Sequence, residues 1–203
     1  TKGVEFLFKK NKVTYIKGKG VLFSKNDVVV YDNNNKSSFN AKNIVIATGS
    51  EVASLPGIEI DEKNIISSTG ALSLNKVPKK LAIIGGGYIG LEMGSVWSRL
   101  GSEVTVIEYL DYITPGMDRE ISNEFQKILT KQGIKFKMRS KVNSVKKNIS
   151  GVTINYTDIK NSKDETLDFD KVLVSVGRKP YTEGLNLTKI GVKKDKKGRI
   201  EVN

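Results

Sequence analysis

The chain has 203 residues and a formal net charge of +12, and it contains neither cysteine nor histidine. These two absences exclude disulfides, thiolate nucleophiles and a Ser-His-Asp triad, and no metal site is expected without the commonest metal ligands. No apolar run approaches the roughly 18 residues of a membrane-spanning helix, so no membrane segment is expected. The lysines are spread without an Arg-rich block or a basic–aromatic stripe, which predicts a solvated surface and no nucleic-acid binding.

Residues 13–49 are predicted to be rich in β-structure. A polar turn is expected at residues 32–38, and the β-branched runs predict short strands at residues 13–16, 28–31 and 44–47. The last run ends abruptly at Thr48-Gly49-Ser50, which suggests that the end of a buried strand meets a ligand there. Residues 51–79, punctuated by prolines, are interpreted as a connector.

The rest of the chain alternates strands and helices, which indicates a doubly wound α/β fold with a parallel sheet. Residues 81–84 form an apolar run and are expected to be the central strand. The further predicted elements are a helix at 88–100, a strand at 104–107, a helix at 118–132, a short strand at 134–136, a β-meander at 142–170 and a buried strand at 172–176.

A GxGxxG motif lies between the first of these strands and the first helix. Gly85 allows a tight turn, Gly87 lets the backbone approach a pyrophosphate, and Gly90 lets the helix pack closely on the strand. The helix N-terminus then presents free N–H groups and partial positive charge to the phosphates. A strand before the motif and a strand–acid pair after it make this a specific signal for dinucleotide binding.

Glu108 closes the second strand, 23 positions after the first glycine, where an acid is expected to bind the adenine ribose. Its carboxylate would accept from the 2′-OH and repel the 2′-phosphate of NADP. The residues that follow, Tyr109, Leu110 and Asp111, include no arginine, and the next one is Arg119. The sequence therefore predicts NAD(H) rather than NADP(H).

Glu92, on the same helix, has two interpretations that the residue pattern leaves open. It is either a first-turn carboxylate that complements the helix dipole or a partly buried acid that awaits a cation from elsewhere.

The motifs together resemble the flavoprotein disulfide reductases. The resemblance rests on Ala47-Thr48-Gly49-Ser50-Glu51, on the run from Gly85 to Trp97, and on Val176-Gly177-Arg178-Lys179-Pro180. Two further segments, Ser67–Leu72 and Gly94–Gly101, are most similar to the branch that oxidises dihydrolipoamide for 2-oxo acid dehydrogenase complexes. The resemblance implies a Rossmann-like, three-layer FAD/NAD(P)-binding fold with a parallel sheet and a β-meander crossover.

It also implies roles for individual positions. Glu108 would hold the adenine ribose, Val142 would flank the adenine, and Glu92 would pair with a lysine that this chain does not identify. The residues expected to contact NAD are Gly85, Gly86, Gly87, Tyr88, Ile89, Gly90, Leu91, Glu92, Glu108, Val142 and Gly177, and those expected to contact FAD are Gly20, Thr48, Gly49 and Ser50.

The resemblance further implies that the chain is a central part of such an enzyme. Its redox cysteines would precede Thr1, and its acid/base histidine and dimer domain would follow Asn203, so the chain alone is expected to hold no catalytic residue and to be inactive. Four parts are expected: an FAD-domain segment at 1–50, the connector at 51–79, an NAD-binding domain at 80–183 and a return segment at 184–203.

For the parent enzyme, the resemblance implies homodimers, lipoyl domains and the core of a 2-oxo acid dehydrogenase complex as partners, and a bacterial cytoplasm or, alternatively, a mitochondrial matrix. The alternatives left open are another flavin disulfide reductase or NADH oxidase, and a stand-alone NAD-binding module without catalysis.

Overall fold

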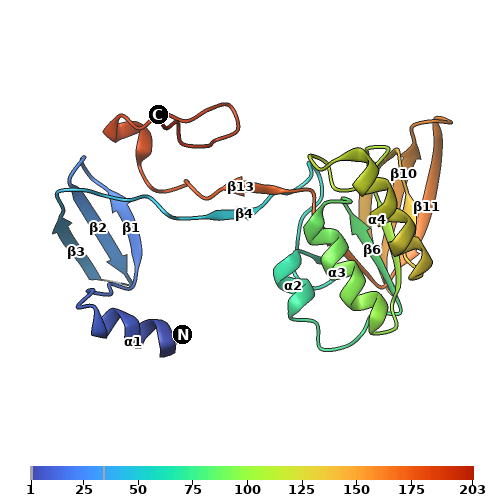
Figure 1. Ribbon diagram of the computed structural model, residues 1–203, viewed down its shortest axis with the longest axis horizontal. Coiled ribbons are helices and arrows are strands. Elements are labelled where there is room, and N and C mark those ends of the chain that lie inside the picture. Colours follow the sequence, from blue (N-terminus) through green and yellow to red (C-terminus); the bar gives the residue numbers. More distant parts are fainter. Residues whose placement is uncertain (1, 34) are drawn as a thin grey trace. The chain divides into compact units, whose positions relative to one another are not determined.

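The computed structural model describes residues 2–33 and 35–203, which divide into two compact units (Figure 1). The first unit comprises Thr1–Glu51 and Lys179–Asn203, and the second comprises Val52–Arg178. No helix in the described part of the chain has the length and apolar character needed to cross a membrane.

The second unit is built on a parallel sheet in the strand order β5-β12-β6-β7-β8. Its described strands are β5 (Ile65–Ile66), β12 (Lys171–Val174), β6 (Lys80–Ile84), β7 (Glu103–Ile107) and β8 (Lys135–Lys137). β6 pairs in parallel with β12 on one side and β7 on the other, so the expected central position of residues 81–84 is confirmed.

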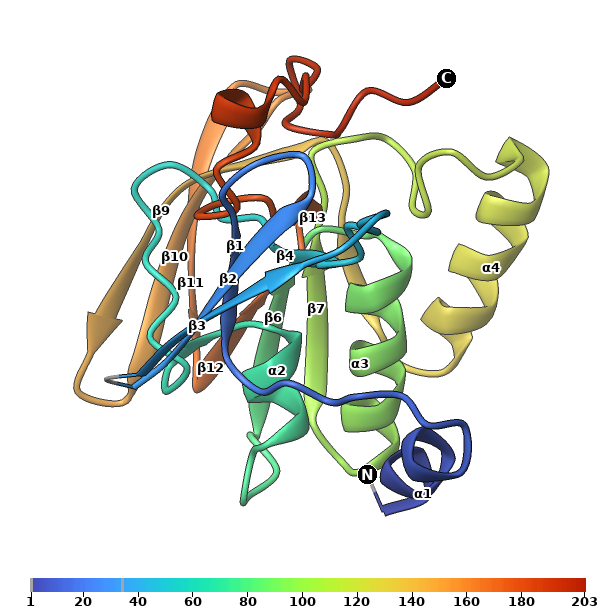
Figure 2. The ribbon, with the colours of Figure 1, turned by 90° about the vertical axis from the view of Figure 1, so that its left-hand side faces the viewer.

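Helices cover one face of this sheet and a β-meander covers the other (Figure 2). The helices are α2 (Ser68–Leu72), α3 (Tyr88–Arg99) and α4 (Arg119–Lys131), and the meander consists of β9 (Ser140–Asn148), β10 (Gly151–Asp158) and β11 (Lys163–Phe169). Strand alternation divides β6 between the two layers: Leu81 and Ile83 pack under the helices, whereas Ala82 and Ile84 pack under the meander. The predicted three-layer α/β architecture with a meander crossover is therefore confirmed.

The first unit contains an antiparallel sheet in the order β1-β2-β3. Its described elements are α1 (Lys2–Lys10), β1 (Lys19–Leu22), β2 (Asp27–Asp32), β3 (Asn35–Asn40) and a 3₁₀ turn at Leu187–Ile190. The paired strands β4 (Ser50–Val52) and β13 (Arg178–Pro180) span the two positions at which the chain passes from one unit to the other. The expected strand at 28–31 is confirmed as part of β2.

Three expectations for this unit are wrong. Residues 13–16 form a loop after α1, and residues 44–47 are not part of any sheet within the described residues, with the Val45 side chain 87% exposed. β-Branched residues favour an extended backbone, but a strand also needs a neighbour to complete its hydrogen-bond ladder. Most of the predicted turn at 32–38 is the polar strand β3, in which no side chain is buried; Asn34 lies outside the described residues.

The segment predicted as a connector, 51–79, also contains regular structure. Its β5 is an edge strand of the parallel sheet, and its α2 begins after Ser67, whose hydroxyl accepts from the Thr69 N–H at 3.1 Å. Both elements are too short for a periodic apolar pattern, which explains why the sequence did not reveal them.

Candidate functional site

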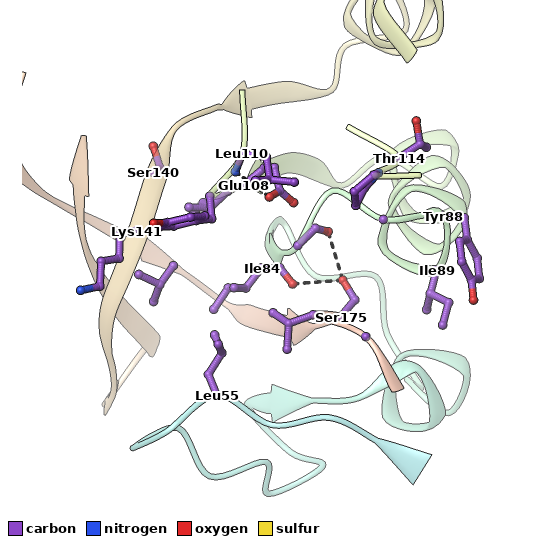
Figure 3. Close-up of a pocket in the computed structure, with 18 of the residues that line it drawn as sticks. Leu55, Ile84, Tyr88, Ile89, Glu108, Leu110, Thr114, Ser140, Lys141 and Ser175 are labelled. Atoms are coloured by element: carbon purple, nitrogen blue, oxygen red, sulfur yellow. Dashed lines mark hydrogen bonds between the residues drawn. The ribbon is translucent and has the colours of Figure 1, made fainter. Parts of the chain in front are cut away.

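A cavity of about 790 Å³ lies in the second unit, where the strands β6, β7 and β12 end (Figure 3). This is the edge at which parallel α/β sheets bind ligands. Seven of the residues predicted to contact NAD line the cavity: Gly85, Gly87, Tyr88, Ile89, Glu108, Val142 and Gly177. The lining also includes apolar side chains such as Leu55 and Ile107, as expected of a pre-formed ligand site.

The three glycines of the motif meet three different steric demands. Gly85 has φ = +105°, and a Cβ there would lie 2.6 Å from the Ser175 carbonyl oxygen. A Cβ at Gly90 would lie 2.5 Å from the Gly85 carbonyl oxygen and 2.9 Å from Ile83, so helix and strand pack too closely for a side chain. A Cβ at Gly87 would meet no protein atom within 4 Å, because this glycine faces the cavity. Gly87 thus leaves open a space that a phosphate can approach.

The N-terminus of α3 opens onto the same space. Gly87 is the N-cap residue and has no side-chain cap, and its carbonyl oxygen accepts the first helical hydrogen bond from the Leu91 N–H at 3.1 Å. The N–H groups of the first turn have no partner within the helix, and Tyr88 and Ile89 line the cavity. The geometry suits an anionic group of a ligand.

Glu108 is the buried acid of the cavity, with 7% of the residue exposed. Its Oε2 accepts a hydrogen bond from the Gly86 N–H at 2.5 Å, and its Oε1 accepts one from the Leu110 N–H at 2.8 Å. Each carboxylate oxygen has a second lone pair, so the side chain keeps acceptor capacity for a ribose hydroxyl. The sequence located this acid, but it did not reveal that the carboxylate also braces the glycine turn.

Two further residues that hold the turn were missed by the sequence reasoning. The Ser175 hydroxyl donates to the carbonyl oxygens of Ile84 at 3.1 Å and Gly85 at 3.2 Å, as the dashed lines in Figure 3 show. The Thr114 N–H donates to the Gly86 carbonyl oxygen at 2.8 Å, and Thr114 adopts φ = +51°, which is uncommon for a β-branched residue. Neither residue belongs to a motif, so no signal in the chain pointed to it.

The structure also modifies the charge argument about cofactor choice. Arg119, which follows Glu108 at a distance in sequence, and Arg139, which lies far along the chain, both form ion pairs with Asp111, with N–O distances of 2.9 and 3.1 Å. Two guanidinium groups therefore lie beside Asp111, three positions after Glu108, where the sequence indicated no arginine.

The remaining expected NAD residues do not line the cavity. The Gly86 N–H is bonded to Glu108, Gly90 packs against Ile83 of β6, and Leu91 of α3 is buried in the helix-side core. Glu92 is exposed and follows the first turn of α3, which contains no acidic residue, so neither interpretation of Glu92 is met in this chain. At the far side of the cavity Gly177 has φ = +124°, and its carbonyl oxygen accepts from the Ala53 N–H at 3.1 Å.

The four residues expected to contact FAD lie in the first unit. Gly20 is in β1, and the Thr48 hydroxyl donates to the Tyr181 carbonyl oxygen at 2.6 Å. Gly49 has φ = +72°, and Ser50 begins β4. A smaller cavity of about 380 Å³ in this unit is lined by other residues, among them Leu22, Ile44 and Val192. In the described part of the chain, no group of three acidic side chains is arranged to hold a metal ion.

The chain belongs to the pyridine nucleotide-disulphide oxidoreductase family, whose model matches residues 1–203. Among solved structures, the HOCl-induced flavoprotein disulfide reductase RclA from Escherichia coli is similar, with a TM-score of 0.83 and 27% identity over 98% of this chain and 46% of that chain. The resemblance to flavoprotein disulfide reductases is thereby confirmed.

Within the family, the similar curated relatives include several named as dihydrolipoamide or dihydrolipoyl dehydrogenases and two named as leghemoglobin reductases. The chain is 60% identical to a dihydrolipoamide dehydrogenase of Chaetomium thermophilum, which it matches over its whole length and over 41% of the relative. It is 57% identical to the mitochondrial dihydrolipoyl dehydrogenase 1 of Arabidopsis thaliana, over its whole length and 40% of the relative, and 53% identical to dihydrolipoyl dehydrogenase 3 of Pseudomonas putida, over 98% of this chain and 43% of the relative. The chain thus spans about two fifths of the length of these relatives.

Proposed function

We propose that the second unit binds NAD(H) and that the chain is the NAD-binding part of a dihydrolipoyl dehydrogenase. The observation that carries the binding proposal is the cavity that joins the side-chain-free space at Gly87 to the buried carboxylate of Glu108. In the whole enzyme, electrons from dihydrolipoamide would pass through a redox disulfide and FAD to NAD⁺, giving NADH and lipoamide. The identity of 52–60% to relatives named as dihydrolipoamide or dihydrolipoyl dehydrogenases supports this choice.

The residues of the chain would position the cofactor and tune its surroundings. The pyrophosphate would lie over Gly87 and accept from the free N–H groups at the start of α3. The Glu108 carboxylate would accept from the adenine ribose hydroxyls, with the adenine beside Val142. Bound NAD⁺ would supply the hydride acceptor, and the residues of this chain would orient it. Glu92, exposed on α3, would pair with a lysine from another part of the enzyme.

Titration of the 203-residue chain with NADH and NADPH tests the binding proposal. We expect NADH to bind more tightly, and we expect Glu108→Gln to weaken NADH binding about tenfold or more, since a hydrogen bond to a charged group contributes roughly 1.5–3 kcal/mol. Glu120, exposed in the first turn of α4, provides the matched control: Glu120→Gln removes the same charge outside the cavity and should leave binding unchanged. Tighter binding of NADPH than NADH by the unmodified chain would contradict the assignment of Glu108.

A stand-alone NAD-binding module is the alternative of a different class. The coding sequence that precedes Thr1 distinguishes the two, because the proposed enzyme requires a Cys-x₄-Cys pair there. Since the chain itself contains no cysteine and no histidine, we expect it to oxidise no dihydrolipoamide when purified alone. Turnover of dihydrolipoamide by the isolated chain would refute the proposal that the catalytic groups belong to other parts of the enzyme.

For the first unit, we propose that Gly20 and Thr48-Gly49-Ser50 contribute to an FAD site that other parts of the enzyme complete. Retention of flavin by the purified chain would contradict that view.

Homodimerisation and assembly with lipoyl domains of a 2-oxo acid dehydrogenase complex are proposed for the whole enzyme. Relatives named as mitochondrial and a relative from Pseudomonas putida support a mitochondrial matrix and a bacterial cytoplasm as the two candidate compartments.

A further inference from the structure

A cluster of three charged side chains forms just beyond the end of β7. The Asp111 Oδ2 atom lies 2.9 Å from an Arg119 guanidinium nitrogen and 3.1 Å from an Arg139 guanidinium nitrogen. Arg119 comes from the start of α4, and its guanidinium carbon lies 4.2 Å from the centre of the Tyr112 ring. One carboxylate thus holds two guanidinium groups, one from the start of α4 and one from the link between β8 and β9.

Backbone hydrogen bonds tie this cluster to the ribose end of the cavity. The Arg139 N–H donates to the Leu110 carbonyl oxygen at 2.9 Å, and the next residue, Ser140, donates from its N–H to the Glu108 carbonyl oxygen at 2.8 Å. Leu110, Ser140 and Glu108 all line the cavity. Asp111, Arg119 and Arg139 do not themselves line the cavity, but Asp111 and Arg139 are the immediate chain neighbours of residues that line it on the side of the buried acid.

The charges of the cluster do not balance, because two guanidinium groups face one carboxylate. Guanidinium groups bind phosphate through paired N–H donors, and they are the groups by which proteins recognise a ribose 2′-phosphate. The hydrogen bond from Arg119 holds the pKa of the Asp111 carboxyl below its usual range, so this carboxylate remains ionised at neutral pH. While Asp111 is ionised, N–H donors of both arginines are directed at its carboxylate.

We propose that Asp111 masks a binding site for an adenosine 2′-phosphate, made by Arg119 and Arg139, and that it is the second determinant of the preference for NAD(H), beside Glu108. The proposal rests on the NAD(H) site proposed above. Glu108 disfavours the 2′-phosphate by direct repulsion, whereas Asp111 acts by occupying the two side chains that would otherwise bind it. Lys141 lines the cavity in the unmodified chain and in Asp111→Asn alike, so its charge does not account for a difference in 2′-phosphate affinity between them.

The test uses 2′,5′-ADP, which carries the 2′-phosphate on adenosine but no nicotinamide, titrated by calorimetry into the 203-residue chain. We expect Asp111→Asn to bind this probe about tenfold more tightly than the unmodified chain, or better, as one new charge-assisted hydrogen bond implies. NADH binding should be unchanged, because Glu108 and the glycine turn are intact. The gain should disappear when Arg139→Gln is added to Asp111→Asn.

Asp195→Asn is the matched control. Asp195 also pairs with an arginine, Arg199, at 2.7 Å, but it lies in the first unit, so its substitution removes the same charge without altering affinity for 2′,5′-ADP. Equal affinity for the probe in Asp111→Asn and in the unmodified chain would overturn the proposal. Asp111→Ser provides a second variant should Asp111→Asn unfold. Failure of the unmodified chain to bind NADH would instead refute the NAD(H) site, while the comparison with 2′,5′-ADP still decides the role of Asp111.

Discussion

The glycines at 87 and 90 allow stability and cofactor binding to be perturbed separately by the same chemical change. A methyl group added at position 90 would meet the Gly85 carbonyl oxygen at 2.5 Å, and real Cβ atoms do not approach closer than 3.0 Å. Because that oxygen belongs to the backbone of the glycine turn, α3 must move by at least half an ångström. A methyl group added at position 87 meets no protein atom within 4 Å.

The two substitutions should therefore differ in a predictable way. Overpacking costs about 1–3 kcal/mol, and the backbone contact at 2.5 Å puts Gly90→Ala near the upper end of that range. The higher helix propensity of alanine returns up to about 1 kcal/mol, so the free energy of unfolding should fall by about 2 kcal/mol. Gly87→Ala changes an N-cap position, where glycine is preferred over alanine, and should cost about 0.5–1 kcal/mol. However, it places a Cβ where the pyrophosphate would approach, and NADH affinity should fall about tenfold or more.

Trp97 makes the assay selective for the second unit. It is the chain's single tryptophan, and it lies on α3 with its side chain buried in the helix-side core, so its fluorescence in a urea titration reports the unfolding of this unit. Calorimetry with NADH supplies the second measurement. Unchanged unfolding of Gly90→Ala would refute the packing argument, and unchanged NADH affinity of Gly87→Ala would refute the assignment of this position to the pyrophosphate.

Two other predictions concern side chains outside the cavity. Asp61 accepts from three backbone N–H groups and pairs with Lys147 at 3.1 Å; although burial opposes it, these contacts lower the pKa of the Asp61 carboxyl below its ordinary value. The stability that the Asp61 carboxylate contributes is therefore fully present above about pH 4 and is lost as the pH falls through the folded-state pKa. Asp61→Asn should lower the free energy of unfolding by about 1–3 kcal/mol at pH 7, and urea titrations should show this difference shrinking towards pH 2. A cost that is constant with pH would contradict the role of the charge. The buried Tyr156 hydroxyl donates to Glu165, so Tyr156→Phe should cost about 1–2 kcal/mol in the same titration while NADH affinity stays the same, and a loss of NADH affinity would contradict a purely structural role.

The sequence was most informative where one residue type meets a local steric or electrostatic demand. Gly90 could be assigned to close helix–strand packing because the motif, the strand before it and the helix after it lie within a few residues of one another. The position of Glu108 could be predicted for the same reason. The ion pairs of Arg139 could not, because Arg139 reaches Asp111 only through the pairing of distant segments. The error at 44–47 has a related cause, since β-propensity describes a strand but not the neighbour that the strand needs.

The two hydrogen bonds of Glu108 bear on how cofactor preference can evolve in this chain. The carboxylate that would select the ribose also fixes the Gly86 N–H, and hence the turn that would carry the pyrophosphate. A replacement by arginine would remove this acceptor and leave a buried donor unsatisfied, so a mutation that changes specificity also loosens the phosphate site. An evolutionary path from NAD(H) to NADP(H) that begins with replacement of Glu108 would then pass through intermediates that bind both cofactors poorly, unless a compensating acceptor for Gly86 arose first. Epistasis of this kind would favour retention of the existing cofactor preference.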